Sequence, residues 1–325
     1  MNGNMPERRD LLLAAGALAG LAATGRPAAA QHNVPWSTGT APARTPAPPN
    51  ATDCHFHIYD ARFPAAPGAP LLPPDATVEN YRALQRRIGT TRGVLVQPST
   101  YGVDNRLHLE SMAALGRDNF RMVAVVNDQV TDAELRRLHA AGVRGIRFNL
   151  VQAGATNIQM LEPLSRRVAR LGWHVQLHML GPQIAEANDL LLRLPSRIVF
   201  DHRGRLPRPA GLNQAGYVTM LRLLAKGNTW VKISALYMDT EVGPPGYADS
   251  VLVAQALHAA NPNRMVWGSD WPHPTEPADR KPDDAVLFDL LTVCVPNEAQ
   301  RHRVLVENPA ELYDFPRVNA RRPRA

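Results

Sequence analysis

Strand-like segments alternate with helix-like segments along the whole chain. Helix-compatible runs such as 132–141, 161–171 and 250–260 separate short stretches rich in β-branched and aromatic residues. Regular alternation at this spacing is typical of a parallel sheet, and eight repeats favour a closed barrel over an open, doubly wound sheet. We therefore predict a (β/α)8 TIM barrel. Its expected strands cover residues 53–57, 93–97, 121–127, 145–150, 173–179, 197–202, 229–235 and 265–270.

Polar side chains stand at the ends of the first and last of these strands. His55 and His57 are two residues apart, so on a strand they point to the same face. Asp270 ends the eighth strand. Barrels of this kind place their catalytic groups at the carboxyl ends of the strands, so we expect these three residues to meet in an active site.

The middle strands have one apolar and one polar face. Their apolar faces must meet the surrounding helices, which leaves the polar faces pointing into the barrel. An arginine and a lysine in that interior would be costly to bury without partners, so we expect either mutual pairing or an anionic ligand. The interior residues predicted in this way are Arg147, Asn149, His174, Gln176, His178, Lys232 and Ser234.

Length and composition fit one catalytic domain. The chain has 325 residues, of which 45% are hydrophobic, and this is enough for a single large barrel. The formal net charge of +7 raises the question of nucleic-acid binding, but the basic residues are scattered. The one dense basic run lies in the tail at 317–324, so we expect no nucleic-acid partner.

The first thirty residues have the composition of an export signal. Arg8 and Arg9 stand directly before the apolar run 11–23, and three alanines at 28–30 offer a cleavage site. Paired arginines point to the twin-arginine (Tat) route, and we expect a periplasmic enzyme. The apolar run is too short for a convincing membrane span, so no stable membrane anchor is expected.

The predicted organisation follows from these boundaries. An export signal at 1–30 precedes a proline-rich lead-in at 31–50, the barrel covers 51–316, and a basic tail ends the chain at 317–325. A second proline-rich stretch at 62–74 follows the first strand and is a candidate wall or lid over the site.

Four motifs resemble the amidohydrolase superfamily. They are DCHFH at 53–57, DHRGR at 201–205, GSDWPH at 268–273 and ENPAELY at 307–313. The resemblance covers roughly residues 50–316 and is strongest to the branch that contains 2-pyrone-4,6-dicarboxylate lactonases and D-galactarolactone isomerases. It implies a TIM barrel of the amidohydrolase type and a lactone substrate.

The resemblance also implies roles for individual residues. His55, His57 and His202 match the family's first-strand and sixth-strand histidines, Asp270 matches its general base, and Arg147 matches an arginine that holds a substrate carboxylate. His178 joins the catalytic candidates because it faces the interior. Further candidates for substrate binding are Ser99, Asn149, Gln176 and Tyr237.

Two departures from the family pattern limit what carries over. The fourth strand has no lysine or glutamate that could bridge two metal ions, which argues against a binuclear site. The lactonases that this chain resembles use a further arginine after the seventh strand, where Leu236 and Tyr237 stand here. This puts the dicarboxylate in doubt as the substrate.

A metal ion is an open alternative at this point. His55, His57, His178 and Asp270 have the donor types for one divalent ion, zinc or manganese. The resemblance to lactonases that work without metal favours no cofactor, with the histidines polarising the carbonyl by hydrogen bonding.

The leading hypothesis is a hydrolase that opens the ring of a small acidic lactone. Asp270 would take a proton from water, the histidines would stabilise the oxyanion, and Arg147 would anchor a carboxylate. The alternatives are a metal-dependent decarboxylase of the same superfamily, a sugar-acid lactone isomerase, and an exported binding protein without catalysis.

Overall fold

The computed structural model describes residues 33–152, 154–206 and 211–316. The predicted export signal and basic tail lie outside these residues. Eight strands are found, each within two or three residues of its predicted place. They are β1 (Thr52–Phe56), β2 (Arg92–Val96), β3 (Phe120–Ala124), β4 (Val143–Asn149), β5 (His174–His178), β6 (Arg197–Phe200), β7 (Thr229–Ile233) and β8 (Met265–Trp267).

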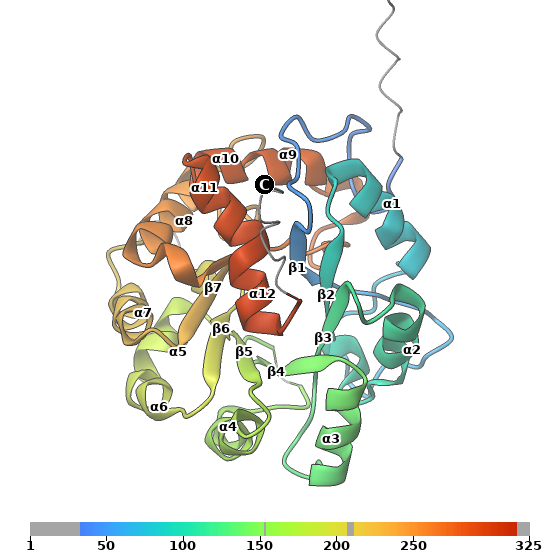
Figure 1. The fold of residues 1–325 in the computed structure, drawn as a ribbon, viewed down its shortest axis with the longest axis vertical. Coiled ribbons are helices and arrows are strands. Elements are labelled where there is room, and N and C mark those ends of the chain that lie inside the picture. Colours follow the sequence, from blue (N-terminus) through green and yellow to red (C-terminus); the bar gives the residue numbers. More distant parts are fainter. Residues whose placement is uncertain (1–32, 153, 207–210, 317–325) are drawn as a thin grey trace, which may run out of the picture. The chain divides into compact units, whose positions relative to one another are not determined.

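Helices surround these strands on the outside, as Figure 1 shows. Most of them connect one strand to the next, while the last four follow β8. Their bounds are α1 (Val78–Ile88), α2 (Arg106–Leu115), α3 (Asp132–Ala140), α4 (Leu161–Ala169), α5 (Gly181–Glu186), α6 (Asn188–Arg193), α7 (Ala215–Lys226), α8 (Ala248–Ala260), α9 (Asp284–Asp289), α10 (Leu291–Cys294), α11 (Glu298–His302) and α12 (Asn308–Tyr313).

The strands form a parallel barrel in sequence order. Each strand pairs with the next from β1 to β8. The ring is completed where Phe56 bridges Trp271 and the His57 amide donates to the Trp271 carbonyl at 2.9 Å. The predicted TIM barrel is confirmed, and His57 and Asp270 lie beside this seam at the carboxyl ends of β1 and β8.

The predicted division into an apolar outer face and a polar inner face is also confirmed. Outward side chains such as Ile146, Val175 and Ile233 are buried in the main hydrophobic core with the helices. The amino-terminal end of the interior is apolar instead, with Val94, Val199 and others forming a second cluster. Helix α12 adds Leu312 and Tyr313 to this cluster and lies across that end of the barrel in Figure 1.

Strand β1 contains a bulge that shapes the site. Asp53 pairs with Gly93 and Phe56 with Leu95, so Cys54 and His55 together face one residue of β2. An extra residue of this kind interrupts the alternation of side chains. Cys54 therefore packs in the inner apolar cluster while the next residue, His55, also points inward. The prediction that His55 faces the interior was right, but simple alternation was not the reason.

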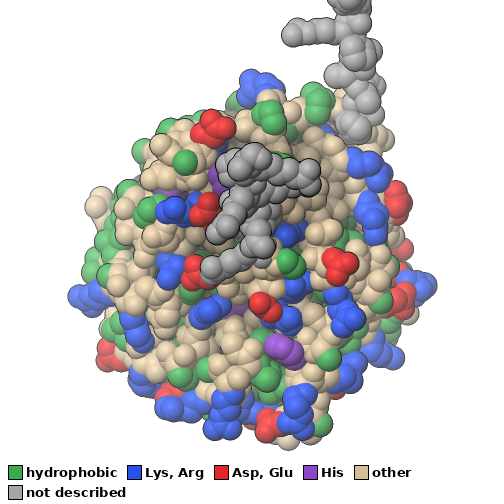
Figure 2. Space-filling view, viewed as in Figure 1, with side chains coloured by type: hydrophobic (Ala, Val, Ile, Leu, Met, Phe, Trp, Pro, Cys, Tyr) green, Lys and Arg blue, Asp and Glu red, His purple; other side chains and the backbone are tan. Residues whose placement is uncertain are grey.

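Several further features concern the surface and the cysteines. Cys54 and Cys294 are both buried and free. Within the described ranges no helix is long and apolar enough to cross a membrane. On the face shown in Figure 2, Lys and Arg side chains are interspersed with Asp and Glu around the rim.

Candidate active site

Asp270 is the central carboxylate of the site. It follows β8, and its amide donates to the His55 carbonyl at 2.7 Å. Its backbone is left-handed, with φ of 64°, a conformation that Asp and Asn tolerate better than most residues. The neighbouring Ser269 fixes the same turn through Asp53, which accepts hydrogen bonds from the Ser269 amide at 2.9 Å and hydroxyl at 2.6 Å. The β1–β8 seam therefore sets the position of Asp270.

Three imidazoles converge on one oxygen of this carboxylate. The Nε2 atoms of His55, His57 and His202 lie 3.4, 3.5 and 3.7 Å from Asp270 Oδ1. All four side chains are almost completely buried. The other oxygen, Oδ2, accepts a hydrogen bond from the Tyr237 hydroxyl at 2.5 Å. Asp270 thus has one oxygen held by tyrosine and the other directed at the histidines.

Tyr237 is held in turn by a second histidine and carboxylate. His273 Nδ1 lies 3.2 Å from the Tyr237 hydroxyl, and His273 Nε2 lies 3.1 Å from Asp284 Oδ2. His273 therefore positions Asp270 through Tyr237, without contacting the carboxylate directly.

Below the histidines lies a layer of paired charges. Arg147 Nε donates to Asp201 Oδ2 at 3.0 Å, and Lys232 Nζ lies 3.6 Å from Asp201 Oδ1. Lys232 also donates to Gln176 Oε1 at 2.8 Å. Burial alone would raise the pKa of Asp201, but the surrounding positive groups hold it well below its usual value. The interior arginine and lysine are therefore paired mutually with one aspartate, one of the two predicted outcomes.

Hydrogen-bond partners determine which ring nitrogens carry protons. His57 Nδ1 lies 2.7 Å from the Val96 carbonyl, which can only accept, so neutral His57 presents a lone pair at Nε2. Lys232 Nζ lies 3.1 Å from His55 Nδ1. An ammonium group can only donate, so this contact favours a proton on His55 Nε2, 3.2 Å from His57 Nε2, whereas Asp201 Oδ1, 3.3 Å from the same Nδ1, can only accept and favours a proton on Nδ1.

The pKa values of these groups match that arrangement. Burial lowers the pKa of His55 and of His178 to about 3, so both are neutral at physiological pH. Burial also lowers the pKa of Lys232 to about 8, which leaves it largely protonated near neutrality. Burial opposes ionisation of Asp270, but His202, His57 and His55 hold its pKa well below the usual range. The site therefore combines an ionised carboxylate with neutral imidazoles.

A cleft opens above Asp270 at the carboxyl end of the barrel. It is lined by His57, His178 and His202, by Ser99 and Asn149, and by the guanidinium groups of Arg147 and Arg205. Leu71 forms part of the wall, and its carbonyl accepts a hydrogen bond from Thr100 Oγ1 at 2.9 Å. The proline-rich loop at 62–74 thus borders the cleft, as a wall was expected to do.

Arg205 reaches the cleft from the turn that follows β6. The turn η3 (His202–Arg205) has left-handed backbone at several residues, which turns His202 and Arg205 toward the same side. Arg205 donates to Asp239 through Nε at 2.6 Å and Nη2 at 2.9 Å, and Nη1 lies 3.0 Å from His178 Nε2. Because a guanidinium can only donate, His178 uses the Nε2 lone pair to accept this bond.

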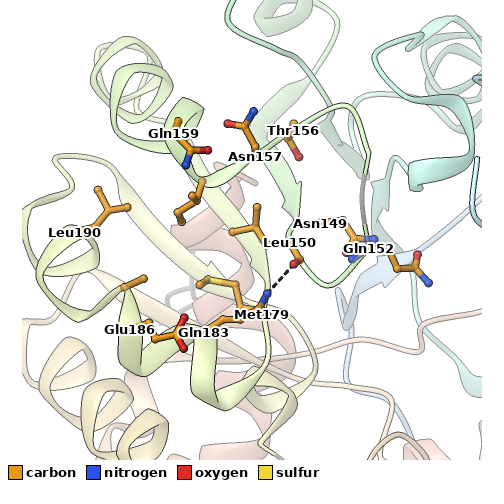
Figure 3. Close-up of a pocket in the computed structure, with 12 residues that line it drawn as sticks. Asn149, Leu150, Gln152, Thr156, Asn157, Gln159, Met179, Gln183, Glu186 and Leu190 are labelled. Carbon is orange, nitrogen blue, oxygen red and sulfur yellow. Dashed lines mark hydrogen bonds between the residues drawn. The ribbon is translucent and has the colours of Figure 1, made fainter. Parts of the chain in front are cut away.

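A second, larger pocket adjoins the cleft. Its volume is about 500 Å³, and it lies between the loop after β4 and helices α5 and α6 (Figure 3). Asn149 and Gln152 line both spaces. The pocket is formed by apolar and amide side chains, and Gln183 Nε2 donates to the Leu150 carbonyl at 2.8 Å across its base. Glu186 is the charged residue that lines it.

The structure brings most of the predicted site residues together. Asp270, His55, His57 and His202 form the central cluster. Arg147, Ser99 and Asn149 line the cleft, with Asn149 Nδ2 donating to Ser99 Oγ at 2.8 Å. Tyr237 binds Asp270.

Two predicted roles need correction. Gln176 was expected to bind substrate, but it is fully buried, holds Lys232 and does not line the cleft. His178 was expected among the metal ligands, but it accepts from Arg205. The described residues whose ligand atoms do lie together, within 4.8 Å, are His55, His202 and Asp270.

Sequence reasoning missed the importance of Arg205 and Asp239. Arg205 belongs to the DHRGR motif at 201–205, but the motif by itself assigns it no partner and no place in the site. Asp239 lies in an irregular loop after β7, where no periodic pattern or motif marks it. Its position beside Arg205 depends entirely on how two loops fold over the barrel.

Comparison with known proteins places the chain in one family. Residues 52–315 match the amidohydrolase family. The chain is 34% identical over 283 residues to a 4-sulfomuconolactone hydrolase of Rhizobium radiobacter, covering 84% of this chain and 93% of the relative. It is 33% identical over 290 residues to a 2-pyrone-4,6-dicarboxylate hydrolase of Comamonas testosteroni, covering 86% and 94%.

A relative with a different activity is equally similar. The chain is 33% identical over 287 residues to a D-galactarolactone isomerase of Agrobacterium fabrum, covering 87% of this chain and 97% of the relative. Among solved structures, a protein of Agrobacterium tumefaciens superposes with a TM-score of 0.80 at 31% identity, covering 87% of this chain and 99% of that one. Two of these relatives, the sulfomuconolactone hydrolase and the galactarolactone isomerase, are named for a lactone.

Proposed function

This chain belongs to the amidohydrolase family, and from that premise we propose that it hydrolyses the ring of a small carboxylated lactone. The observation that carries the proposal is the ionised Asp270, which faces three imidazoles at the base of a cleft lined by Arg147. The two hydrolases named above act on lactones, which supports the same reaction class here.

In the proposed mechanism Asp270 acts as general base. A water molecule beside Oδ1 donates its proton to Asp270 while its oxygen attacks the lactone carbonyl. The new C–O bond forms, the ring C–O bond breaks, and the ring oxygen leaves as a hydroxyl after taking up the proton that Asp270 removed from the water. The products are an open-chain hydroxy acid or its keto tautomer, bearing one carboxylate more than the substrate.

The histidines divide the remaining work. His55 Nε2–H is oriented by the Lys232 contact at Nδ1, and His202 is held through Nδ1 by Ser234 Oγ at 2.9 Å. Both can donate to the oxyanion that develops on the carbonyl oxygen. His57 Nε2 lies 3.2 Å from His55 Nε2 and 3.5 Å from Asp270 Oδ1, so we propose that His57 joins these residues in binding the water and the oxyanion.

Arg147 is proposed to anchor the substrate carboxylate. Its Nε is paired with Asp201, while its other donors border the cleft. We expect Arg147→Met to reduce the affinity for a carboxylated lactone by about 10- to 100-fold, because a charge-assisted hydrogen bond is lost in a desolvated site. An uncharged lactone of the same ring should lose much less affinity. Steady-state kinetics on the two substrates measure the difference.

The control for this variant is its stability. Asp201 keeps Lys232 as a partner when Arg147 is removed, so thermal unfolding should still show a cooperative transition. Equal losses of affinity on charged and uncharged lactones would assign Arg147 a purely structural role beside Asp201.

The same residues also fit one divalent metal ion. His55, His202 and Asp270 offer nitrogen and oxygen donors of the kind that zinc and manganese accept. Such an ion would polarise the carbonyl and lower the pKa of bound water. It would also require an unprotonated His55 Nε2, which Lys232 at Nδ1 disfavours and which Asp201 Oδ1, 3.3 Å from the same Nδ1, favours. The contacts of His55 are compatible with either state, and we propose hydrolysis without a resident metal because the chain resembles lactonases that work without one.

Metal analysis tests this part of the proposal. We expect lactone hydrolysis to survive prolonged treatment with a chelator, and elemental analysis of the purified protein to find well under one equivalent of zinc or manganese. One tightly bound equivalent of zinc or manganese per chain would instead favour the metal-dependent decarboxylase as the second candidate function. Loss of lactone hydrolysis on chelation, and its return when the metal is restored, would contradict the metal-free mechanism.

Isomerisation is a second candidate for the same site, because one relative is a lactone isomerase. Carrying out the reaction in ¹⁸O-labelled water separates the two, since hydrolysis places the label in the product carboxylate and isomerisation does not.

We also propose that the enzyme is exported by the twin-arginine route to the periplasm. Support comes from Arg8, Arg9 and the apolar run 11–23 alone, which lie outside the described residues. Recovery of the enzyme in the periplasmic fraction, and its loss from that fraction when both arginines are replaced by lysine, tests the proposal.

A further inference from the structure

Resting on the proposed lactone hydrolysis, we propose that Asp239 restricts the substrate to lactones with a single anionic group. Asp239 does so by occupying the edge of Arg205 that would otherwise bind a second substrate carboxylate. Asp239 is thus a specificity-determining residue, and the substrate class narrows to lactones with one negative charge.

The geometry of the Arg205–Asp239 pair is that of a bound carboxylate. Nε donates to Oδ2 at 2.6 Å and Nη2 donates to Oδ1 at 2.9 Å, so the two groups meet in a parallel, two-pronged contact. Guanidinium groups recognise substrate carboxylates with this same fork. The remaining nitrogen, Nη1, is taken by His178. All three nitrogens of Arg205 are therefore engaged within the protein.

Arg147 differs from Arg205 in the donors that it keeps. Asp201 accepts from Nε alone, at 3.0 Å, and the contact from Nη2 to His178 Nδ1 is longer, at 3.5 Å. Within the described residues Nη1 of Arg147 makes no hydrogen bond to the protein. Arg147 shares Asp201 with Lys232, so its charge is only partly compensated and it can receive one substrate carboxylate. Arg205 keeps one N–H each on Nη1 and Nη2, but Asp239 already compensates its charge, so a second carboxylate there would be repelled by Asp239.

Within residues 33–152, 154–206 and 211–316, Arg147 and Arg205 are the only lysines or arginines that line the cleft, so a second anion would have to bind at one of them. The adjoining pocket offers amides and apolar groups, and its charged residue is Glu186. An anionic group that enters either space without a cation would lose its hydration without compensation.

The substrates that the relatives' names imply differ in the number of their negative charges. A lactone formed within an aldaric acid such as galactaric acid keeps one carboxylate, because the other acid group closes the ring. Pyrone-4,6-dicarboxylate carries two carboxylates, and sulfomuconolactone carries a carboxylate and a sulfonate. The site is suited to the aldaric-acid lactones, which carry one negative charge and whose other polar groups are neutral hydroxyls.

The test compares two lactones that share one ring, 2-pyrone-6-carboxylate and 2-pyrone-4,6-dicarboxylate. We expect wild-type kcat/KM to be higher for the monocarboxylate. In Asp239→Asn the ratio of dicarboxylate to monocarboxylate kcat/KM should rise by about 10- to 100-fold, because the freed guanidinium gains a charged partner. The matched control is Asp104→Asn, which removes the carboxylate from a similar two-pronged pair with Arg106 on the surface. That control should leave the ratio unchanged.

The outcomes separate this inference from the proposed function. If the wild-type enzyme hydrolyses neither these pyrones nor aldaric-acid lactones, the proposed function fails. If it hydrolyses the dicarboxylate better and Asp239→Asn leaves the ratio unchanged, only the role of Asp239 is overturned.

A measurement on the wild-type enzyme covers the case in which Asp239→Asn does not fold. Pyridine-2-carboxylate should then inhibit lactone hydrolysis at a lower concentration than pyridine-2,4-dicarboxylate. The reverse order would overturn the inference.

Discussion

Replacing Asp270 with Asn is expected to lower kcat for lactone hydrolysis by about 10²–10⁴-fold, the usual contribution of a general base. The amide cannot take the proton from water, although it matches the carboxylate in size. Asn also tolerates the left-handed backbone at this position, where φ is 64°, so the turn after β8 should be retained. Single-turnover or steady-state hydrolysis of the preferred lactone measures the loss.

Two controls accompany this variant. Its thermal unfolding should remain cooperative, and Asp104→Asn, which removes a surface carboxylate, should keep wild-type kcat. Tyr237→Phe should give a smaller loss than Asp270→Asn, because Tyr237 only holds the second carboxylate oxygen. Near-wild-type turnover by Asp270→Asn would show that another group is the base.

The second large effect expected is a steep loss of stability in mild acid. Burial lowers the pKa of His55, His108, His174 and His178 to about 3, below the value of about 6.5 that histidine has in an unfolded chain. A group with a depressed pKa contributes stability above its unfolded pKa and loses it as the pH falls. The stability should therefore be fully present above pH 7 and decrease from about pH 6.5 toward pH 3.

The size of this effect follows from the protons taken up on unfolding. Each such histidine contributes up to about 1.4 kcal/mol per pH unit once the pH is well below 6.5. Asp53 acts in the opposite direction, because burial raises its pKa to about 6 in the folded state and its stabilising effect is lost as the pH rises through that value. With one of these protons offset, the four histidines alone should lower the free energy of unfolding by roughly 4 kcal/mol per pH unit near pH 5. His202, whose pKa burial also lowers well below its usual value, should make the slope steeper.

Urea unfolding between pH 8 and pH 5 measures this slope. His174 lies beneath the active site, with its ring against Tyr313, so His174→Gln can be compared without changing the cleft. This variant should have a slope smaller by about 1.4 kcal/mol per pH unit, whatever its stability at pH 8. A wild-type free energy of unfolding that is constant from pH 8 to pH 5 would contradict the prediction.

Much of the fold could be predicted because it depends on local patterns. Strand and helix periodicities alternate throughout the chain, and a parallel barrel is the arrangement that buries eight such repeats. The same alternation placed Arg147, Gln176 and Lys232 inside the barrel, where they are found. His55, His57 and Asp270 could be predicted as a cluster because the carboxyl ends of parallel strands meet at one end of a barrel. His202 was added by the resemblance to the amidohydrolase superfamily.

Partners that come from different strands and loops could not be predicted in this way. Alternation shows which way Arg147 points, but not that Asp201 lies 3.0 Å from it. The bulge in β1 arises from its pairing with β2, and the residues of DCHFH do not by themselves predict it. The metal-competent set among the described residues contains His202 in place of His57 and His178, and Arg205 approaches His178 from another loop.

The sequence by itself therefore determined the barrel, the end at which the site lies, and the residue types that form it. The tertiary structure decided which charges are left for a substrate. Asp201 accepts a hydrogen bond from Nε of Arg147, whereas Asp239 accepts from both Nε and Nη2 of Arg205. The physical reason is that side-chain periodicity is a property of one strand. A hydrogen bond or ion pair instead requires that the distance between segments far apart in the chain be correct to within a few tenths of an ångström.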